Sequence, residues 1–464
     1  MLGFQEVLTP TIYKEMLWRQ SGHWDNYKDD MFMVYSPQRQ GDSAVAAVIE
    51  PGDLQAPTES YGSNVVETYG LKPMNCPGHC ILFRSKRRTY KELPIRYAEF
   101  SPLHRNEISG ALSGMTRVRR FHQDDGHIFC RPSQVMDEVV RSIQFVKLVY
   151  RALHFQISDL RFILSTRPKE GYIGAVEEWD MAEAQLKKAL AHDASKEGEH
   201  VPWTESEGEG AFYGPKIDVM LRDSDGKQHQ TATIQLDFQL PKRFQLEYYA
   251  PAPDFEARGW ITDDPLFLET VGRVTPVMIH RAILGSLERF IALLLERDHG
   301  KLPFWLSPRQ MIILTVSDNR RVVEEARRVR DDLSNTTPEI METPRTLNQP
   351  TYIVDLDASG DSIAQKVARA KSGKYNFICV IGMKNIRGLE VYHGKPTMDV
   401  EVNRAMQPEL VKTWDHIEKI KPGSQAPKQK DRGVGGYGGG GADGVRLEVG
   451  MVKELMTRLC DDYL

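Results

Sequence analysis

The sequence predicts an α+β fold for a first, larger region and a smaller α/β fold for the region that follows. Gln230–Phe238 alternates polar and apolar residues at a period of two, as a half-buried strand does. Ile279–Arg297 instead has the spacing of an amphipathic helix with one apolar face. After about residue 308, strand-like and helix-like segments alternate, which is typical of a largely parallel sheet. We therefore expect one domain at 1–302 and a second at 303–464.

A proline-punctuated segment, Lys301–Pro308, separates the two regions. Beyond it the pattern predicts strands at 311–316, 353–355 and 376–381, and helices at 320–333, 362–372 and 449–459. The segment at 433–444 is rich in glycine, and we expect it to be a flexible loop. Two stretches without periodicity are expected to be surface insertions, at 36–64 and 254–264.

Composition excludes several classes of protein. Hydrophobic residues make up 41% and charged residues 27% of the 464 residues, and no run of apolar residues approaches the roughly 18 that span a membrane. Five cysteines are too few, and odd in number, for a disulfide framework. We expect a reducing compartment, the cytoplasm, with an organellar form left open. The net charge of −4 means that a nucleic acid would have to bind at local basic patches.

Arginine and carboxylate side chains gather in two segments. In Ser101–Gly110, Arg105 and Glu107 would share one face if the segment is a strand. A guanidinium can bind a phosphate while a carboxylate accepts from an amino group, although for an isolated pair a surface ion pair is the better explanation. Arg117–His127 holds three arginines, two acids and two histidines. Phosphate binding beside a carboxylate or metal site and an ordinary solvated strand pair explain this segment about equally well.

The metal signal and the last charged segment are weak by themselves. Asn75–Cys80 contains Cys-x-x-His, but no second pair at finger-like spacing accompanies it, so a structural zinc finger is disfavoured. A catalytic zinc needs only three ligands, which can be distant in sequence, whereas a lone cysteine is more often a small buried hydrophobe. In Ala282–Arg289, a glycine precedes a Glu-Arg pair at the point where a strand is expected to end and a helix to begin. By itself, this Glu-Arg pair is more simply interpreted as an exposed charge pair on an ordinary helix.

Taken together and in order, these segments resemble the threonyl-tRNA synthetase family of class II aminoacyl-tRNA synthetases. The resemblance rests on seven strings in register, at Gly3–Thr11, Ser21–Lys28, Lys72–His79, Arg105–Ser113, Phe121–Phe129, Ala211–Lys216 and Pro276–Gly285. It implies a catalytic core built on an antiparallel sheet of six or seven strands with flanking helices, followed by an anticodon-binding domain. Pro10 would belong to the first class II motif, Arg105 and Glu107 to the second, and Gly285 and Arg289 to the third.

The resemblance also implies a role for each matching residue. Cys76, His127 and His280 match the ligands of one zinc ion per chain. The amino-acid pocket would consist of Met74, Arg105, Gln123, Asp125, Tyr213 and Gln235, with Asp125 accepting from the threonine hydroxyl. The site for ATP, with its Mg²⁺, would consist of Arg105, Glu107, Arg117, Val118, Phe121, Lys216, Gln230, Thr233 and Arg289. The resemblance implies four catalytic residues. Three of them, Arg105, Lys216 and Arg289, belong to the ATP site, and the fourth, His23, would act in transfer to the tRNA ribose.

The expected reaction joins threonine to ATP and then transfers it to the 3′ end of tRNA(Thr), in a homodimer without a membrane anchor. A related ligase for serine or proline would not need Cys76, His127 and His280 together. A catalytically impaired paralogue that binds tRNA or a partner is the remaining alternative. The sequence shows no segment that we assign to the editing domain common in the family. In Gly382–Asn385, Asn385 stands where the family usually has Glu, so no anticodon-reading residue is carried over.

Overall fold

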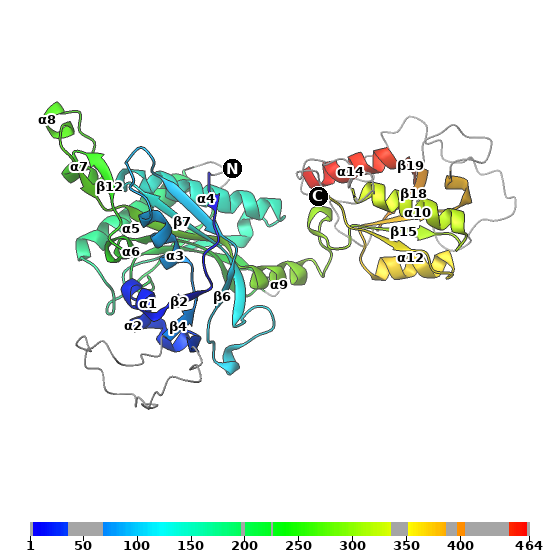
Figure 1. Cartoon of the computed structure of the whole chain (residues 1–464), viewed down its shortest axis with the longest axis horizontal. Helices are drawn as coiled ribbons and strands as arrows, with labels where there is room; N and C mark the ends of the chain where they lie inside the picture. Colours follow the sequence, from blue (N-terminus) through cyan, green and yellow to red (C-terminus); the bar gives the residue numbers. More distant parts are fainter. Residues whose placement is uncertain are drawn as a thin grey trace, which may run out of the picture. The chain divides into compact units, whose positions relative to one another are not determined.

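A computed structural model describes residues 3–35, 68–195, 200–223, 226–335, 351–386, 397–403 and 445–461. The chain forms two compact units, Met1–Leu293 and Leu294–Leu464 (Figure 1). The predicted domain boundary after residue 302 stays a prediction. The glycine-rich loop expected at 433–444 and the insertion expected at 36–64 lie outside the described residues. No helix in the described part of the chain is both long enough and apolar enough to span a bilayer.

A nine-stranded sheet forms the centre of the first unit, in the order β1-β5-β7-β14-β11-β10-β8-β9, with β6 paired to β7. The strands from β5 to β8 in this order are antiparallel, which confirms the expected antiparallel core, while β1 and β9 join the two edges in parallel. The strand bounds are β1 Gln5–Glu6, β5 Ile95–Glu99, β6 Pro102–His104, β7 Arg120–Cys130, β8 Leu160–Ser165, β9 Trp203–Ser206, β10 Lys216–Arg222, β11 Gln228–Asp237 and β14 Val277–Ser286.

The prediction of a single helix over Ile279–Arg297 is wrong in its first half. Residues up to Ser286 belong to β14, and helix α9 (Leu287–Arg297) begins only after them. Strand β14 lies between β7 and β11 and is buried at every position from Val277 to Ile283. A strand covered on both faces has no period-two pattern, so its apolar run continues into that of the helix without a visible break.

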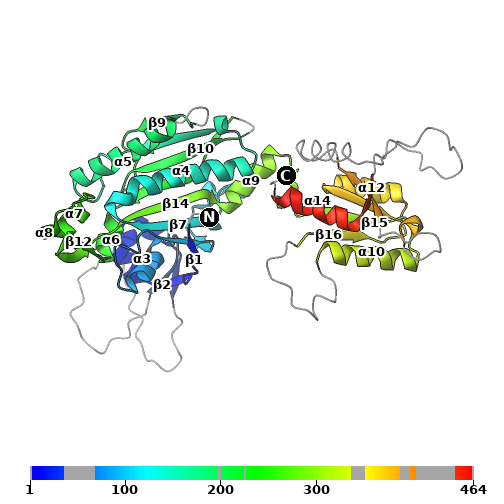
Figure 2. The same cartoon turned by 90° about the horizontal axis from the view of Figure 1, so that it is seen from above.

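Two long helices, α4 (Val135–Ala152) and α5 (Val176–Ala194), cover one face of this sheet (Figure 2). Apolar residues of α4 recur every three or four positions, and Val139, Ile143 and Val146 are buried as a result. Helix α3 (Cys76–Arg84) packs on the opposite face, where Phe83 stacks on Phe129 of β7 at 4.7 Å.

Smaller elements complete the first unit. The two small sheets consist of β2 Ile12–Lys14, β3 Met33–Tyr35 and β4 Thr68–Leu71, and of β12 Tyr248–Pro251 and β13 Val271–Val274. The short helices are α1 Glu15–Ser21, α2 His23–Tyr27, α6 Gln239–Arg243, α7 Pro253–Ala257 and α8 Pro265–Leu268. The insertion expected at 254–264 thus contains most of α7 and the loop that leads to α8.

The second unit is an α/β fold with a five-stranded sheet in the order β16-β15-β17-β18-β19. The three strands expected from the sequence are parallel to one another, while β18 and β19, which were not predicted, are antiparallel. The elements are β15 Met311–Thr315, α10 Arg320–Leu333, β16 Val354–Asp357, α12 Ile363–Ser372, β17 Phe377–Ile381, β18 Thr397–Val402, β19 Val445–Glu448 and α14 Val449–Asp461.

Candidate functional site

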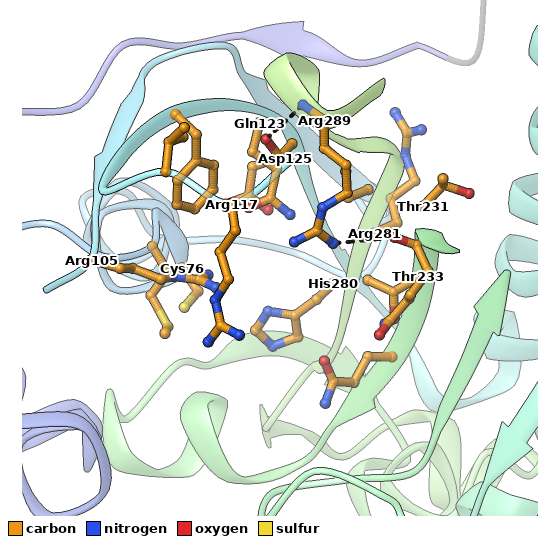
Figure 3. A pocket seen from close by; sticks show the side chains of 18 of the residues that line it. Cys76, Arg105, Arg117, Gln123, Asp125, Thr231, Thr233, His280, Arg281 and Arg289 are labelled. Carbon is orange, nitrogen blue, oxygen red and sulfur yellow. Dashed lines mark hydrogen bonds between the residues drawn. The ribbon is translucent and has the colours of Figure 1, made fainter. Parts of the chain in front are cut away.

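A pocket of about 330 Å³ lies in the first unit and gathers side chains from several strands of the large sheet (Figure 3). Among the described residues, all but two of the predicted site residues line it. These lining residues are Met74, Cys76, Arg105, Glu107, Arg117, Val118, Phe121, Gln123, Asp125, His127, Tyr213, Gln230, Thr233, Gln235, His280 and Arg289. The two that do not line it are Lys216 and His23.

Strand alternation explains how β7 supplies so much of this pocket. Phe121, Gln123, Asp125 and His127 occupy every second position and therefore point to the same face. Across the sheet, His127 pairs directly with His280 of β14. His280 in turn pairs with Gln235 of β11, so these three side chains form one row.

Cys76, His127 and His280 bring three possible metal-ligand atoms to within 4.8 Å of one another, and all three residues are buried. Cys76 is the first residue of α3, and the two histidines face each other from β7 and β14. His127 Nε2 and His280 Nδ1 are 3.1 Å apart. Two nitrogen ligands of one tetrahedral zinc, at about 2.05 Å each, would lie roughly 3.3 Å apart. The spacing therefore fits a shared ion.

The hydrogen-bond partners of the histidines indicate which nitrogen of each ring carries a proton. His280 Nε2 lies 2.8 Å from the carboxylate of Asp237 and must donate to it. His127 Nδ1 lies 2.7 Å from Nδ1 of His79, whose Nε2 lies 3.1 Å from the carboxylate of Glu99. If His79 donates to that carboxylate, its Nδ1 must accept from His127. The lone pairs of His127 Nε2 and His280 Nδ1 then face each other.

Electrostatics around this group also suit a cation. Burial would raise the pKa of Glu99, but hydrogen bonds from His79, Lys72 and Ser101 outweigh it and lower that pKa to about 2. Burial, followed by the nearby His79 and His280, lowers the pKa of His127 well below its usual range, so its ring is neutral. The two lone pairs that face each other repel, and a metal ion bound between the two nitrogens would remove that repulsion.

Polar side chains next to these three residues form one end of the pocket. The carboxylate of Asp125 accepts from Asn75 Nδ2 at 3.0 Å, and one of its oxygens lies 3.7 Å from His127 Nε2. Tyr213 donates its hydroxyl hydrogen to Gln235 at 3.1 Å. Burial, and then the charge of Asp125, raises the pKa of the Cys76 thiol, an effect that a bound cation would oppose.

Three arginines form the other end of the pocket. Figure 3 shows Arg117 and Arg289 extending toward its centre, where the ring of His280 also lies. Arg117 pairs with Glu107 at 2.7 Å, and Arg105 lies over the ring of Phe121 at 5.0 Å. Burial, then Arg117 and Arg105, lowers the pKa of Arg289. Like charges crowded in this way favour binding of a polyanion.

The expectation that Arg105 and Glu107 share a strand face is wrong. Strand β6 ends at His104, and both residues follow it in a segment without regular structure. The hydrogen bond from the backbone N–H of Arg105 to Arg119 O, at 2.8 Å, and that from Glu107 to Arg105 O, at 2.9 Å, fold this segment back on itself. Both side chains reach the pocket by this turn and not by strand alternation.

Lys216 and His23 lie outside the lining. Lys216 on β10 pairs with Asp218 at 2.8 Å. His23 is buried, with Nε2 3.8 Å from the sulfur of Cys76 and Nδ1 2.6 Å from Ser21 Oγ. Burial, and then His280, lowers the pKa of His23 to about 4.

Sequence reasoning missed several residues of the site. Asp218 binds Lys216 and also accepts from Gln230 at 2.6 Å and Thr233 at 3.0 Å, so it gathers three predicted ATP-site residues. The sequence could have indicated Asp218, because it lies two residues after Lys216 and therefore on the same face of the strand. Further lining residues were not predicted, namely Tyr27, Thr116, Thr231, Arg281, Ala282 and Ser286, whereas Gly285, assigned to the third motif, also lines the pocket.

Comparison with known proteins gives consistent matches. The family model for the tRNA synthetase class II core domain (G, H, P, S and T) matches residues 61–256. A probable mitochondrial threonine–tRNA ligase of Schizosaccharomyces pombe is 47% identical over 381 residues, which cover 82% of this chain and 72% of that protein. The mitochondrial threonine–tRNA ligase of Saccharomyces cerevisiae is 40% identical over 393 residues, covering 83% and 74%. Threonine–tRNA ligases named cytoplasmic also match, including one from Saccharomyces cerevisiae at 42% identity.

Among solved structures, the RNA binding domain of threonyl-tRNA synthetase from Cryptosporidium parvum Iowa II is 35% identical to this chain. It aligns with a TM-score of 0.69, over 98% of this chain and 86% of that one. The likeness therefore extends beyond the residues that the family model matches.

Proposed function

This chain belongs to the threonine–tRNA ligase family of class II aminoacyl-tRNA synthetases, and from this premise we propose how its residues perform the reaction. The enzyme activates threonine with ATP and Mg²⁺ and charges tRNA. A carboxylate oxygen of threonine forms a bond to the α-phosphorus, and pyrophosphate leaves with the electrons of the broken bond. A ribose hydroxyl of the terminal adenosine of tRNA(Thr) then attacks the acyl carbon, and AMP leaves. No observation favours a catalytically impaired paralogue.

We propose that the arginines bind ATP. Arg105 and Arg289 would bind the α- and γ-phosphates, because guanidinium groups fixed in a half-buried pocket stabilise charge that develops at phosphorus. The crowding of Arg105, Arg117 and Arg289 supports this assignment. Phe121 would stack on adenine once Arg105 turns from the ring toward phosphate. Glu107, Val118, Gln230, Thr233 and Lys216 would complete the site, with Lys216 leaving Asp218 when an anion binds.

The single observation that carries the proposal for the amino-acid end is the 3.1 Å approach of His127 Nε2 to His280 Nδ1 beside Cys76. We propose that Cys76, His127 and His280 hold one Zn²⁺. Bound there, the ion would supply an open coordination position for the amino and hydroxyl groups of threonine. Asp125 would accept the hydroxyl hydrogen. Met74, Gln123, Tyr213 and Gln235 would enclose the rest of the amino acid and exclude water.

His23 is proposed to assist the transfer step. Its pKa of about 4 keeps the imidazole neutral at pH 7, so a ring nitrogen can accept a hydrogen bond from the attacking hydroxyl and orient it. Ser21 Oγ lies 2.6 Å from its Nδ1 and can orient the ring.

Discrimination among amino acids tests this pocket directly. Valine is isosteric with threonine but lacks the hydroxyl, which would leave Asp125 without a partner, so we expect ATP–pyrophosphate exchange with valine to be ~10⁴-fold lower. Serine keeps the hydroxyl and lacks one methyl, worth only ~10–200-fold. Exchange measured with the three amino acids should therefore rank threonine, serine and valine in that order. Comparable use of valine and threonine would refute the hydroxyl-recognition argument.

We propose that the enzyme is a homodimer. Leu8 and Met16 are 83% and 77% exposed, and Ile12 and Phe100 are also exposed. Leu8 and Ile12 flank Pro10, in the segment that resembles the first class II motif, and a second copy of the chain would cover this apolar surface. Sedimentation at micromolar concentration should give a dimer, and Leu8→Glu combined with Met16→Glu should shift it to monomer. A wild-type monomer under these conditions would rule the dimer out.

A reducing compartment is proposed for the protein, with the cytoplasm as our expectation. Each of the five cysteines, all within the described residues, is free. The relatives named mitochondrial and cytoplasmic are both compatible with such a compartment.

A further inference from the structure

A single buried carboxylate, that of Asp124, meets three consecutive backbone N–H groups at the junction of β14 and α9. The N–H of Ile283 donates to it at 2.7 Å, and those of Leu284 and Gly285 donate at 3.0 Å each. Asp124 is only 8% exposed. Because side chains alternate along β7, its carboxylate points away from the face that carries Gln123 and Asp125.

The pairing of the two strands explains why a side chain is needed here. Ala282 pairs with Asp125, and Ser286 pairs with Gln123. Three residues of β14 therefore lie opposite one residue of β7, and the backbone of that residue cannot satisfy three donors. A carboxylate offers about four lone-pair positions and can accept all three hydrogens. Asp124 thus supplies the hydrogen-bond acceptors that the backbone of β7 cannot provide at this bulge.

The bulge determines where α9 starts. Gly285 has a φ of +67°, and a Cβ at this position would lie 2.3 Å from the backbone oxygen of Thr231, so the turn is closely packed against β11. Helix α9 begins two residues later, and Arg289 lies in its first turn, where its N–H donates to Ser286 Oγ at 3.3 Å. A shift of the bulge would therefore move Arg289 in the pocket.

Two further contacts hold the same junction from other directions. Tyr150 of α4 donates its hydroxyl hydrogen to Thr231 Oγ1 or Ile283 O, which lie at 2.6 and 3.0 Å. Glu288 of α9 accepts the backbone N–H of His122 on β7 at 2.9 Å. Asp124 differs from both because it accepts from the backbone N–H groups of all three bulged residues.

We propose that Asp124 is a positioning residue of the ATP site: by binding the N–H groups of residues 283–285, it holds Arg289 in the orientation that receives phosphate. This inference rests on the proposed role of Arg289. It concerns ATP and not threonine, because the bulge leads to α9, whereas the neighbouring Asp125 faces the amino-acid end.

The test is the Asp124→Asn variant, assayed by ATP–pyrophosphate exchange at pH 8. Burial raises the pKa of Asp124 to about 7, so at pH 8 the wild-type side chain is ionised. Asparagine has the same shape, but its amide nitrogen would face backbone N–H groups and cannot accept from them. We expect the KM for ATP to rise at least ~10-fold while the KM for threonine stays within ~2-fold, as removal of charge-assisted contacts predicts.

Asp124→Glu restores a carboxylate and should recover part of the ATP affinity. The matched control is Asp193→Asn, which removes another buried carboxylate, paired with Lys147 between α5 and α4, away from the pocket lining. This control should not change the ratio of the two KM values. Equal rises in both KM values for Asp124→Asn, or an unchanged KM for ATP, would overturn the proposal.

If Asp124→Asn fails to fold, Tyr150→Phe provides the second variant. It removes only the hydroxyl that contacts Thr231 and Ile283, and we expect a smaller rise, about 3-fold, confined to the KM for ATP. No such rise would count against the junction as a determinant of ATP affinity. Arg289→Ala separates the positioning role of Asp124 from the phosphate contact of Arg289. If Arg289→Ala weakens ATP use and Asp124→Asn does not, only the positioning role is refuted. If Arg289→Ala leaves ATP use unchanged, the proposed phosphate contact itself is refuted.

Discussion

Replacing Cys76 with serine, or His280 with alanine, is expected to abolish binding of the proposed zinc ion and threonine activation together. Loss of a residue that hydrogen-bonds to a metal ligand already costs ~10–100-fold in metal affinity. Loss of one of the three proposed ligands should cost more. We therefore expect metal content to fall close to zero after dialysis and threonine-dependent exchange to fall by more than ~100-fold. Elemental analysis and exchange measured on the same preparations check both effects.

Cys80→Ser is the matched control. Cys80 lies four residues after Cys76 on α3 and is also buried, but its sulfur lies 3.8 Å from that of Met278 and outside the three-residue group. This variant should keep its metal. Loss of metal from both cysteine variants would point to general damage to α3, and full retention by Cys76→Ser would show that the ligand set is wrong.

Arg289→Ala is expected to reduce ATP–pyrophosphate exchange by at least ~100-fold. The variant removes the proposed charge-assisted contact to phosphate in a half-buried pocket, which would be worth roughly 3 kcal/mol of transition-state stabilisation. Arg289→Lys keeps the charge but loses the planar fork of donors, so its activity should lie between those of the alanine variant and wild type. Steady-state exchange at several ATP concentrations measures these effects.

Arg297 provides a control on the same helix. It pairs with the adjacent Asp298 at 2.7 Å and does not line the described pocket, so Arg297→Ala should keep exchange within ~2-fold of wild type. An Arg289→Ala enzyme with wild-type exchange would mean that Arg289 carries only a helix surface charge.

Local patterns in the sequence predicted several elements because the two faces of those elements differ in polarity. Strand β11 and helix α10 follow the expected period-two and helical spacings, and in α10 Val322, Ala326, Val329 and Leu333 form the buried stripe. Strand β14 was misassigned because both of its faces are covered, which removes the pattern on which such a prediction depends.

The candidate site depends on contacts between distant parts of the chain. Nothing in the local sequence joins Cys76 to His280, and only the family resemblance grouped them before the structure did. Two carboxylates near the site histidines show no local signal in the sequence. Asp237 contacts His280 directly, and Glu99 acts on His127 only through His79, so both depend on contacts between distant parts of the chain. Asp124 and Asp125 are adjacent and identical in type, and only the direction of each side chain separates their roles.

The most direct test of the account is threonine-dependent ATP–pyrophosphate exchange measured before metal removal, after chelation and after zinc is added back. The account predicts about one zinc per chain in the active enzyme, loss of exchange as the zinc is removed, and recovery as it is restored, with serine exchange following the same course. Full threonine-dependent exchange by a protein that elemental analysis shows to be free of zinc would contradict it.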